Sequence, residues 1–94
     1  MKLPLPDEVA IDGQWIFAKG KVIADEAAVR IDVLTASYLE VVSSVDRWSV
    51  LYRDPNDGRL WEQTYPRGEM HGGGPPRLAV ISLEDARTRY SIST

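Results

Sequence analysis

The chain has 94 residues, of which 44% are hydrophobic and 27% are charged. This length suits a single domain, and the apolar share is enough for a hydrophobic core, which excludes a wholly disordered chain. The chain has no cysteine, which excludes a disulfide framework and a thiolate metal site and fits a reducing compartment.

The charge is unevenly distributed along the chain. The formal net charge is −3, and residues 1–46 carry four basic and eight acidic side chains while residues 47–94 carry seven and six. The acidic half argues against non-specific binding of nucleic acid, which depends on neutralising phosphates. The N-terminal residues lack the apolar run of a signal peptide, and no stretch approaches the roughly 20 apolar residues of a membrane span. A soluble, cytoplasmic protein is therefore expected.

The first half predicts a hairpin followed by a long helix. Residues 14–18 (QWIFA) and 21–23 (KVI) are short β-prone runs around a Lys19-Gly20 turn. From residue 25 to about residue 43 the apolar side chains recur every three or four positions, as on one face of a helix. The residues in this stripe are Val29, Ile31, Leu34, Thr35, Tyr38, Leu39 and Val42. We expect that face to lie on a sheet.

Two strands follow, residues 47–53 (RWSVLYR) and 59–65 (RLWEQTY), around the turn-forming sequence DPNDG. Side chains alternate between the two faces of a strand, so the most consistent pairing gathers the aromatic side chains on one face. That face would carry Trp48, Val50, Tyr52, Trp61, Gln63 and Tyr65, and the opposite face Leu51, Leu60 and Glu62.

The C-terminal part predicts one more strand and a short helix. Residues 77–81 (RLAVI) are a strand, and Ser82 is a suitable N-cap for a helix that runs to about Tyr90. The predicted order is ββαβββα over a single domain, residues 1–94. It indicates the α+β class: a mainly antiparallel sheet with one long helix on a face and a short C-terminal helix.

The candidate metal and phosphate motifs do not fit their chemistry. His71 is the sole histidine, so zinc-site spacings are missing. The DPNDG segment does not match a calcium loop, because Gly58 comes one position early and Tyr65 stands where a bidentate glutamate is needed. Pro75 and Pro76 follow the three glycines where a phosphate loop needs amide donors and a lysine. No cofactor is expected.

Two other kinds of chemistry stay open. Glu62, Glu69 and His71 could converge with Tyr65 for acid–base catalysis in a small hydrolase, although no nucleophile motif accompanies them. Equally, Glu62 could pair with an arginine while Glu69 and His71 hold the glycine loop. Arginines interleaved with aromatic residues are also typical of proteins that bind single-stranded nucleic acid, but the acidic total opposes that function.

The chain resembles a known family in three blocks: DPNDGRLWEQTYP, then EMHGGGPPRL, then a strand followed by SLEDA. It is similar in these blocks to the immunity protein 27 family of bacterial polymorphic-toxin systems. The upstream GQW and KGKVIADE segments extend the similarity over nearly the whole chain. Leu60 departs from the pattern, which has an aromatic residue at that place.

The resemblance implies a small cytoplasmic α+β protein that binds a cognate toxin domain and blocks it without catalysis. Its physical requirements are a rigid scaffold, complementary charge and a few anchoring side chains. The residues that match the motif, and that we expect at the toxin interface, are Trp61, Glu62, Tyr65, Glu69, His71, Gly72, Gly73 and Gly74. Neither the toxin nor the oligomeric state follows from the sequence.

Overall fold

A computed structural model describes residues 2–46, 48–67 and 74–92. Its strands are β1 (Ala10–Asp12), β2 (Trp15–Ala18), β3 (Lys21–Ala24), β4 (Glu40–Asp46), β5 (Ser49–Arg53), β6 (Leu60–Thr64) and β7 (Arg77–Ile81). Its helices are α1 (Glu26–Ser37) and α2 (Leu83–Tyr90). The α+β class is confirmed, and the order is βββαββββα.

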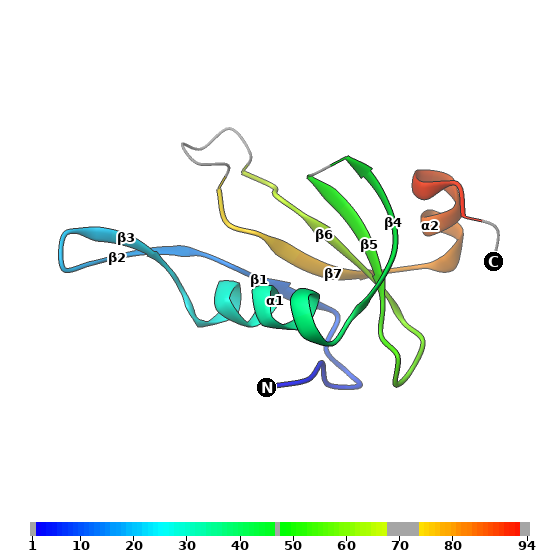
Figure 1. The fold of residues 1–94 in the computed structure, drawn as a ribbon, viewed down its shortest axis with the longest axis horizontal. Coiled ribbons are helices and arrows are strands. Elements are labelled where there is room, and N and C mark those ends of the chain that lie inside the picture. Colours follow the sequence, from blue (N-terminus) through cyan, green and yellow to red (C-terminus); the bar gives the residue numbers. More distant parts are fainter. Residues whose placement is uncertain (1, 47, 68–73, 93–94) are drawn as a thin grey trace.

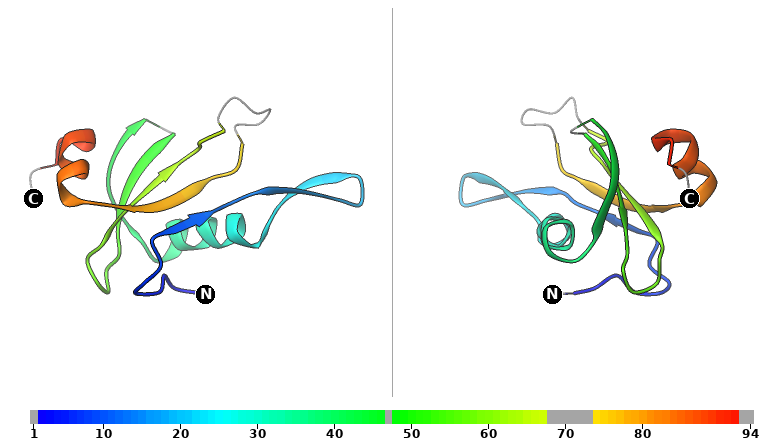
Figure 2. Two further views of the ribbon diagram at one scale, coloured as in Figure 1. Left: turned by 180° about the vertical axis from the view of Figure 1, so that it is seen from behind. Right: turned by 45° about the vertical axis from the view of Figure 1, so that its right-hand side comes forward.

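Five strands form one antiparallel sheet in the order β1-β7-β6-β5-β4 (Figure 1). Strands β2 and β3 pair only with each other and extend away from the body as a ribbon (Figures 1 and 2). Helix α1 lies on one side of the sheet, and α2 lies on the opposite side (Figure 2).

The predicted pairing of the central hairpin is confirmed. Tyr52 lies opposite Trp61, and Val50 lies opposite Gln63, so these side chains share the α1 face. The main core forms there, from Ile11, Ile31, Leu34, Leu39, Tyr52, Trp61 and Leu78. On the other face Leu51 packs with Ala86 and Tyr90 of α2 in a second, smaller core. Both faces of the sheet are therefore covered.

The predicted long helix was wrong at its C-terminal end, where Val42 of the predicted stripe lies exposed in β4, and also at Val29. Helix α1 begins at Glu26, one residue after the predicted start, with Asp25 as its N-cap, but it ends at Ser37, and residues 40–46 form β4 instead. This segment, EVVSSVD, is rich in valine and serine, which are weak helix formers, and it gains a ladder of hydrogen bonds with β5. Val29, assigned to the buried stripe, is exposed on the outer face of α1.

Strand β1 was also missed by the sequence reasoning. It has three residues and one buried side chain, Ile11, so alternation gives almost no signal. It pairs with β7, which lies more than sixty residues further along the chain. Strand β4 is the opposite edge, and Val42 and Val45 are extra residues that form bulges against β5.

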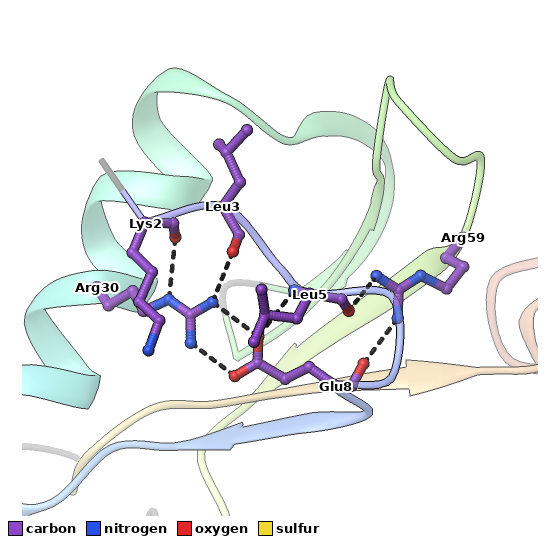
Figure 3. Close-up of polar contacts among 6 residues, drawn as sticks. All are labelled: Lys2, Leu3, Leu5, Glu8, Arg30 and Arg59. Atoms are coloured by element: carbon purple, nitrogen blue, oxygen red, sulfur yellow. Dashed lines mark hydrogen bonds and ion pairs between the residues drawn. The ribbon is translucent and has the colours of Figure 1, made fainter.

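Two arginines hold the N-terminal segment against the body (Figure 3). Arg30 of α1 donates to both carboxylate oxygens of Glu8, each at 2.7 Å, and to the carbonyls of Lys2 and Leu3. Arg59 donates to the carbonyls of Leu5 and Glu8. We call this group the N-terminal clamp. Its hydrogen bonds from Arg30 lower the pKa of Glu8 from 4.5 to about 2.

The DPNDG turn is fixed to the end of α1 through a buried carboxylate. Asp54 accepts a hydrogen bond from the hydroxyl of Tyr38 at 2.5 Å and from the amide of Asn56 at 2.8 Å. The hydrogen bond to Asp54 raises the pKa of Tyr38 to about 12. The turn thus joins the central hairpin to the helix across the α1 face.

Replacing Glu8 by glutamine is expected to weaken the N-terminal clamp most at neutral pH. A carboxylate with a lowered folded-state pKa contributes stability above its unfolded value, and that contribution disappears as the pH falls through the folded value. The difference in free energy of unfolding between wild type and Glu8→Gln should be full above about pH 4.5 and shrink towards pH 2. Urea unfolding at several pH values measures it, with Asp7→Asn as the control. If the difference in free energy of unfolding stays constant down to about pH 2, the pKa of Glu8 is not lowered by the clamp.

Replacing Asp54 by alanine is expected to destabilise the fold by about 2 kcal/mol, because the hydrogen bonds that this buried carboxylate accepts from Tyr38 and Asn56 are lost. Tyr38→Phe removes one of these hydrogen bonds and should shift the melting temperature less. Thermal unfolding of both variants checks the order. Equal melting temperatures for Asp54→Ala and wild type would show that the turn is not fixed through this carboxylate.

Candidate functional site

Trp61 and Glu62 are neighbours in β6 but point to opposite faces of the sheet. Trp61 is fully buried in the main core, and the Arg59 guanidinium lies 5.0 Å from its ring centre. Glu62 receives hydrogen bonds from Arg89 at 2.6 Å and from the Tyr90 hydroxyl at 2.8 Å. Burial and this carboxylate raise the pKa of Tyr90. Both predicted site residues therefore hold the scaffold, Trp61 below α1 and Glu62 below α2.

Tyr65 lies on the α1 face, just past the end of β6. Its ring meets Trp48 edge-on, with ring centres 5.4 Å apart, and its hydroxyl accepts a hydrogen bond from Gln63 at 3.3 Å. Burial raises the pKa of Tyr65, with a smaller contribution from the charge of Asp32. Trp48 is 46% exposed. We call Trp48 and Tyr65 the aromatic rim, because they are where the aromatic face of the hairpin reaches the surface.

Gly74 closes the loop that follows the aromatic rim. Its φ is +70°, and a Cβ there would lie 2.3 Å from the carbonyl oxygen of Arg67, so no other residue fits. Gly74, Pro75 and Pro76 are buried, and the Pro76 carbonyl accepts from the Gly13 amide at 2.9 Å. The predicted contacts Glu69, His71, Gly72 and Gly73 lie outside the described residues.

The acid–base arrangement suggested by the sequence is not assembled by its described members. Glu62 faces α2, whereas Tyr65 faces α1, so the sheet separates them. Among the described residues no cluster of three or more histidine, aspartate or glutamate side chains could hold a metal ion. No helix in that part of the chain is long and apolar enough to cross a bilayer.

An apolar recess of about 510 Å³ lies on the α2 side of the sheet and was not anticipated. Its apolar lining is Val41, Val42, Leu60, Val80, Ile81, Leu83 and Ile92. The charged side chains at its border are paired with neighbours: Arg53 with Glu40 and Arg59 with Asp57, each at 2.7 Å. This recess therefore presents apolar surface but no charged group poised for catalysis.

Sequence reasoning also missed how exposed the β2–β3 ribbon is. The short runs around Lys19-Gly20 predicted a hairpin, which is confirmed. Alternation of apolar residues says nothing about whether a hairpin packs on the body or extends from it. Ile16 and Phe17 are adjacent, so they point to opposite faces of their strand and make both faces apolar. This was the one signal in the sequence for an exposed hairpin.

The scaffold, the aromatic rim and the ribbon together offer surfaces for a partner more than a catalytic pocket. The family model described as Immunity protein 27 matches residues 17–82, which is more than half of the chain. Neither a curated protein nor a solved structure matches the chain. The matched range runs from β2 through β7 and includes the DPNDG turn and the triglycine segment. This chain belongs to the Immunity protein 27 family.

Proposed function

We propose that the protein is a stoichiometric inhibitor of a bacterial toxin domain, which it binds in the cytoplasm of the cell that it protects. Membership of the Immunity protein 27 family carries this proposal, because that family implies a toxin-neutralising role. The inhibitor blocks the toxin by occupying its surface and has no reaction of its own. The alternative of a small hydrolase loses support, because Glu62 is engaged with α2.

The scaffold suits a protein that must present a fixed surface. Two cores cover both faces of one sheet, and the N-terminal clamp and the Asp54 turn join distant segments. A surface that is already ordered before binding loses less conformational entropy in the complex. Tyr65, with Trp48 beside it, is the proposed contact from the aromatic face, while Trp61 and Glu62 act by holding the sheet and α2. Aromatic side chains are frequent binding anchors.

A titration distinguishes an inhibitor from an enzyme. The probe is the C-terminal domain of the protein encoded immediately upstream of this gene, assayed for toxicity and for binding. Toxin activity is expected to fall linearly and to end near one equivalent of the purified chain. Full protection by a small fraction of an equivalent, abolished by Glu62→Gln, would instead identify a catalyst.

Glu69→Ala and His71→Ala are expected to weaken binding of the same toxin domain without lowering the melting temperature. Both residues belong to the motif shared with the family and follow the aromatic rim in the sequence. Glu84→Ala, an exposed carboxylate on α2, is the matched control. Isothermal titration measures the affinities. Unchanged affinity in both variants would remove this segment from the interface.

A further inference from the structure

The β2–β3 ribbon, residues 15–24, is hereafter the arm. It is a separate two-stranded sheet whose strands pair in the register Ile16 with Ile23 and Phe17 with Val22. Figures 1 and 2 show it extending from the body, and the longest axis of the whole molecule, arm included, measures 47 Å. A two-stranded ribbon has little stability of its own in water. An arm of this kind is therefore a costly way to connect β1 with α1.

The arm exposes apolar side chains on both of its faces. Phe17 and Val22 lie opposite each other and are 76% and 62% exposed. Ile16 and Ile23 form the corresponding pair on the other face, with 45% and 43% exposed. Neighbouring apolar groups left in water in this way are typical of surfaces that a partner covers.

The base of the arm is held in one orientation. The Asp25 amide donates to the Gln14 carbonyl at 2.9 Å, and the Gln14 amide donates to the Asp25 carboxylate at 3.1 Å. The same carboxylate caps α1 by accepting from the Ala28 amide at 2.8 Å. Gly13 approaches Ala28 so closely that a Cβ would lie 3.0 Å from the Ala28 Cβ. The arm is thus fixed to α1 at its base while its far part is exposed.

The tip of the arm carries positive charge in an unfavourable backbone conformation. Lys19 and Gly20 make a two-residue turn with φ values of 52° and 74°. Asparagine or glycine is preferred at the first of these positions, and a left-handed conformation costs lysine roughly 1 kcal/mol. Lys19 and Lys21 are exposed, and residues 15–24 contain no acidic side chain. A lysine kept where asparagine fits better is a reason to look for a role in binding.

We infer that the arm is the element that enters the toxin domain, in a cleft with apolar walls and carboxylates at its border. This inference rests on the proposed function. The apolar pairs would be buried between the walls, and Lys19 and Lys21 would meet the carboxylates. Charge complementarity of this kind speeds association, while the apolar pairs would supply most of the affinity.

Charge also argues against three other partners for the arm: a second copy of the chain, a DNA duplex and an anionic membrane. In a symmetric contact of two arm tips, four ammonium groups would come together without a carboxylate on either arm. A DNA duplex would meet two lysines on a chain whose net charge is −3, which is little for binding through phosphates. An anionic membrane would meet the same small charge.

Two pairs of variants test the inference against the probe defined above, the C-terminal domain of the protein encoded immediately upstream. Val22→Ser is matched by Val45→Ser, since both valines are strand residues that are 62% exposed. Lys19→Asn is matched by Lys2→Asn, which removes the same charge from an exposed site outside the arm. Dissociation constants and association rates are measured at low and high salt, together with melting temperatures.

Val22→Ser is expected to weaken binding at least about tenfold, the range of an anchoring residue. Lys19→Asn is expected to slow association severalfold and to reduce its salt dependence while the melting temperature stays equal or rises. Slower association together with an unchanged or higher melting temperature separates a binding role from a structural one. If Lys19 served only the fold, Lys19→Asn would raise the melting temperature and would not slow association. Val45→Ser and Lys2→Asn should bind like wild type, within about twofold.

Each of the remaining outcomes overturns either the arm inference or the proposed function. If wild type binds the toxin and both arm variants bind equally well, the arm inference fails and the proposed function stands. If wild type does not bind, the proposed function fails as well. The arm inference also fails if binding to an anionic vesicle or a DNA duplex is what Lys19→Asn abolishes. It fails again if Val22→Ser leaves toxin binding intact but dissolves a dimer seen by sedimentation.

Discussion

Alternation along β6 divides the protein into two cores, and both helices depend on that division. Trp61 and Gln63 point to α1, while Leu60 and Glu62 point to α2. A shift of one residue in the pairing with β5 would exchange these sets, placing a carboxylate in the main core and an indole on the α2 side. The hydrophobic cost of that exchange fixes the register, and with it the aromatic rim on one face and the packing of α2 on the other.

The same alternation explains which parts of the fold could be predicted. The β5–β6 pairing, β7 and the Ser82 cap of α2 all carry strong local signals, and all are confirmed. Strands β1 and β4 carry weak ones: β1 has one buried residue, and β4 exposes most of its side chains because it lies at the edge. Strand β1 forms through pairing with β7, far along the chain, and β4 forms through pairing with its neighbour β5. Single-sequence periodicity registers neither pairing. The helix was extended through residue 43 for this reason.

The candidate site was predictable in composition but not in orientation. The aromatic residues of β5 and β6 do gather on one face, yet α1 covers most of that face, and the exposed part is the aromatic rim. Trp61 is a large aromatic residue in a recognisable motif, and it serves the core. The arm, in contrast, has ordinary composition, and its exposure follows from the direction in which Gly13, Gln14 and Asp25 aim it.

Strand β4 has a further consequence for the life of the free protein. It is a seven-residue edge strand with exposed valines, which are features of chains that stack into fibrils. The two bulges at Val42 and Val45 interrupt the regular row of amides and carbonyls and increase the local twist. A second molecule would find no straight template along which to add a strand. A protein with the proposed role must stay monodisperse until it meets its target, and this geometry opposes edge-to-edge self-association of the unbound chain.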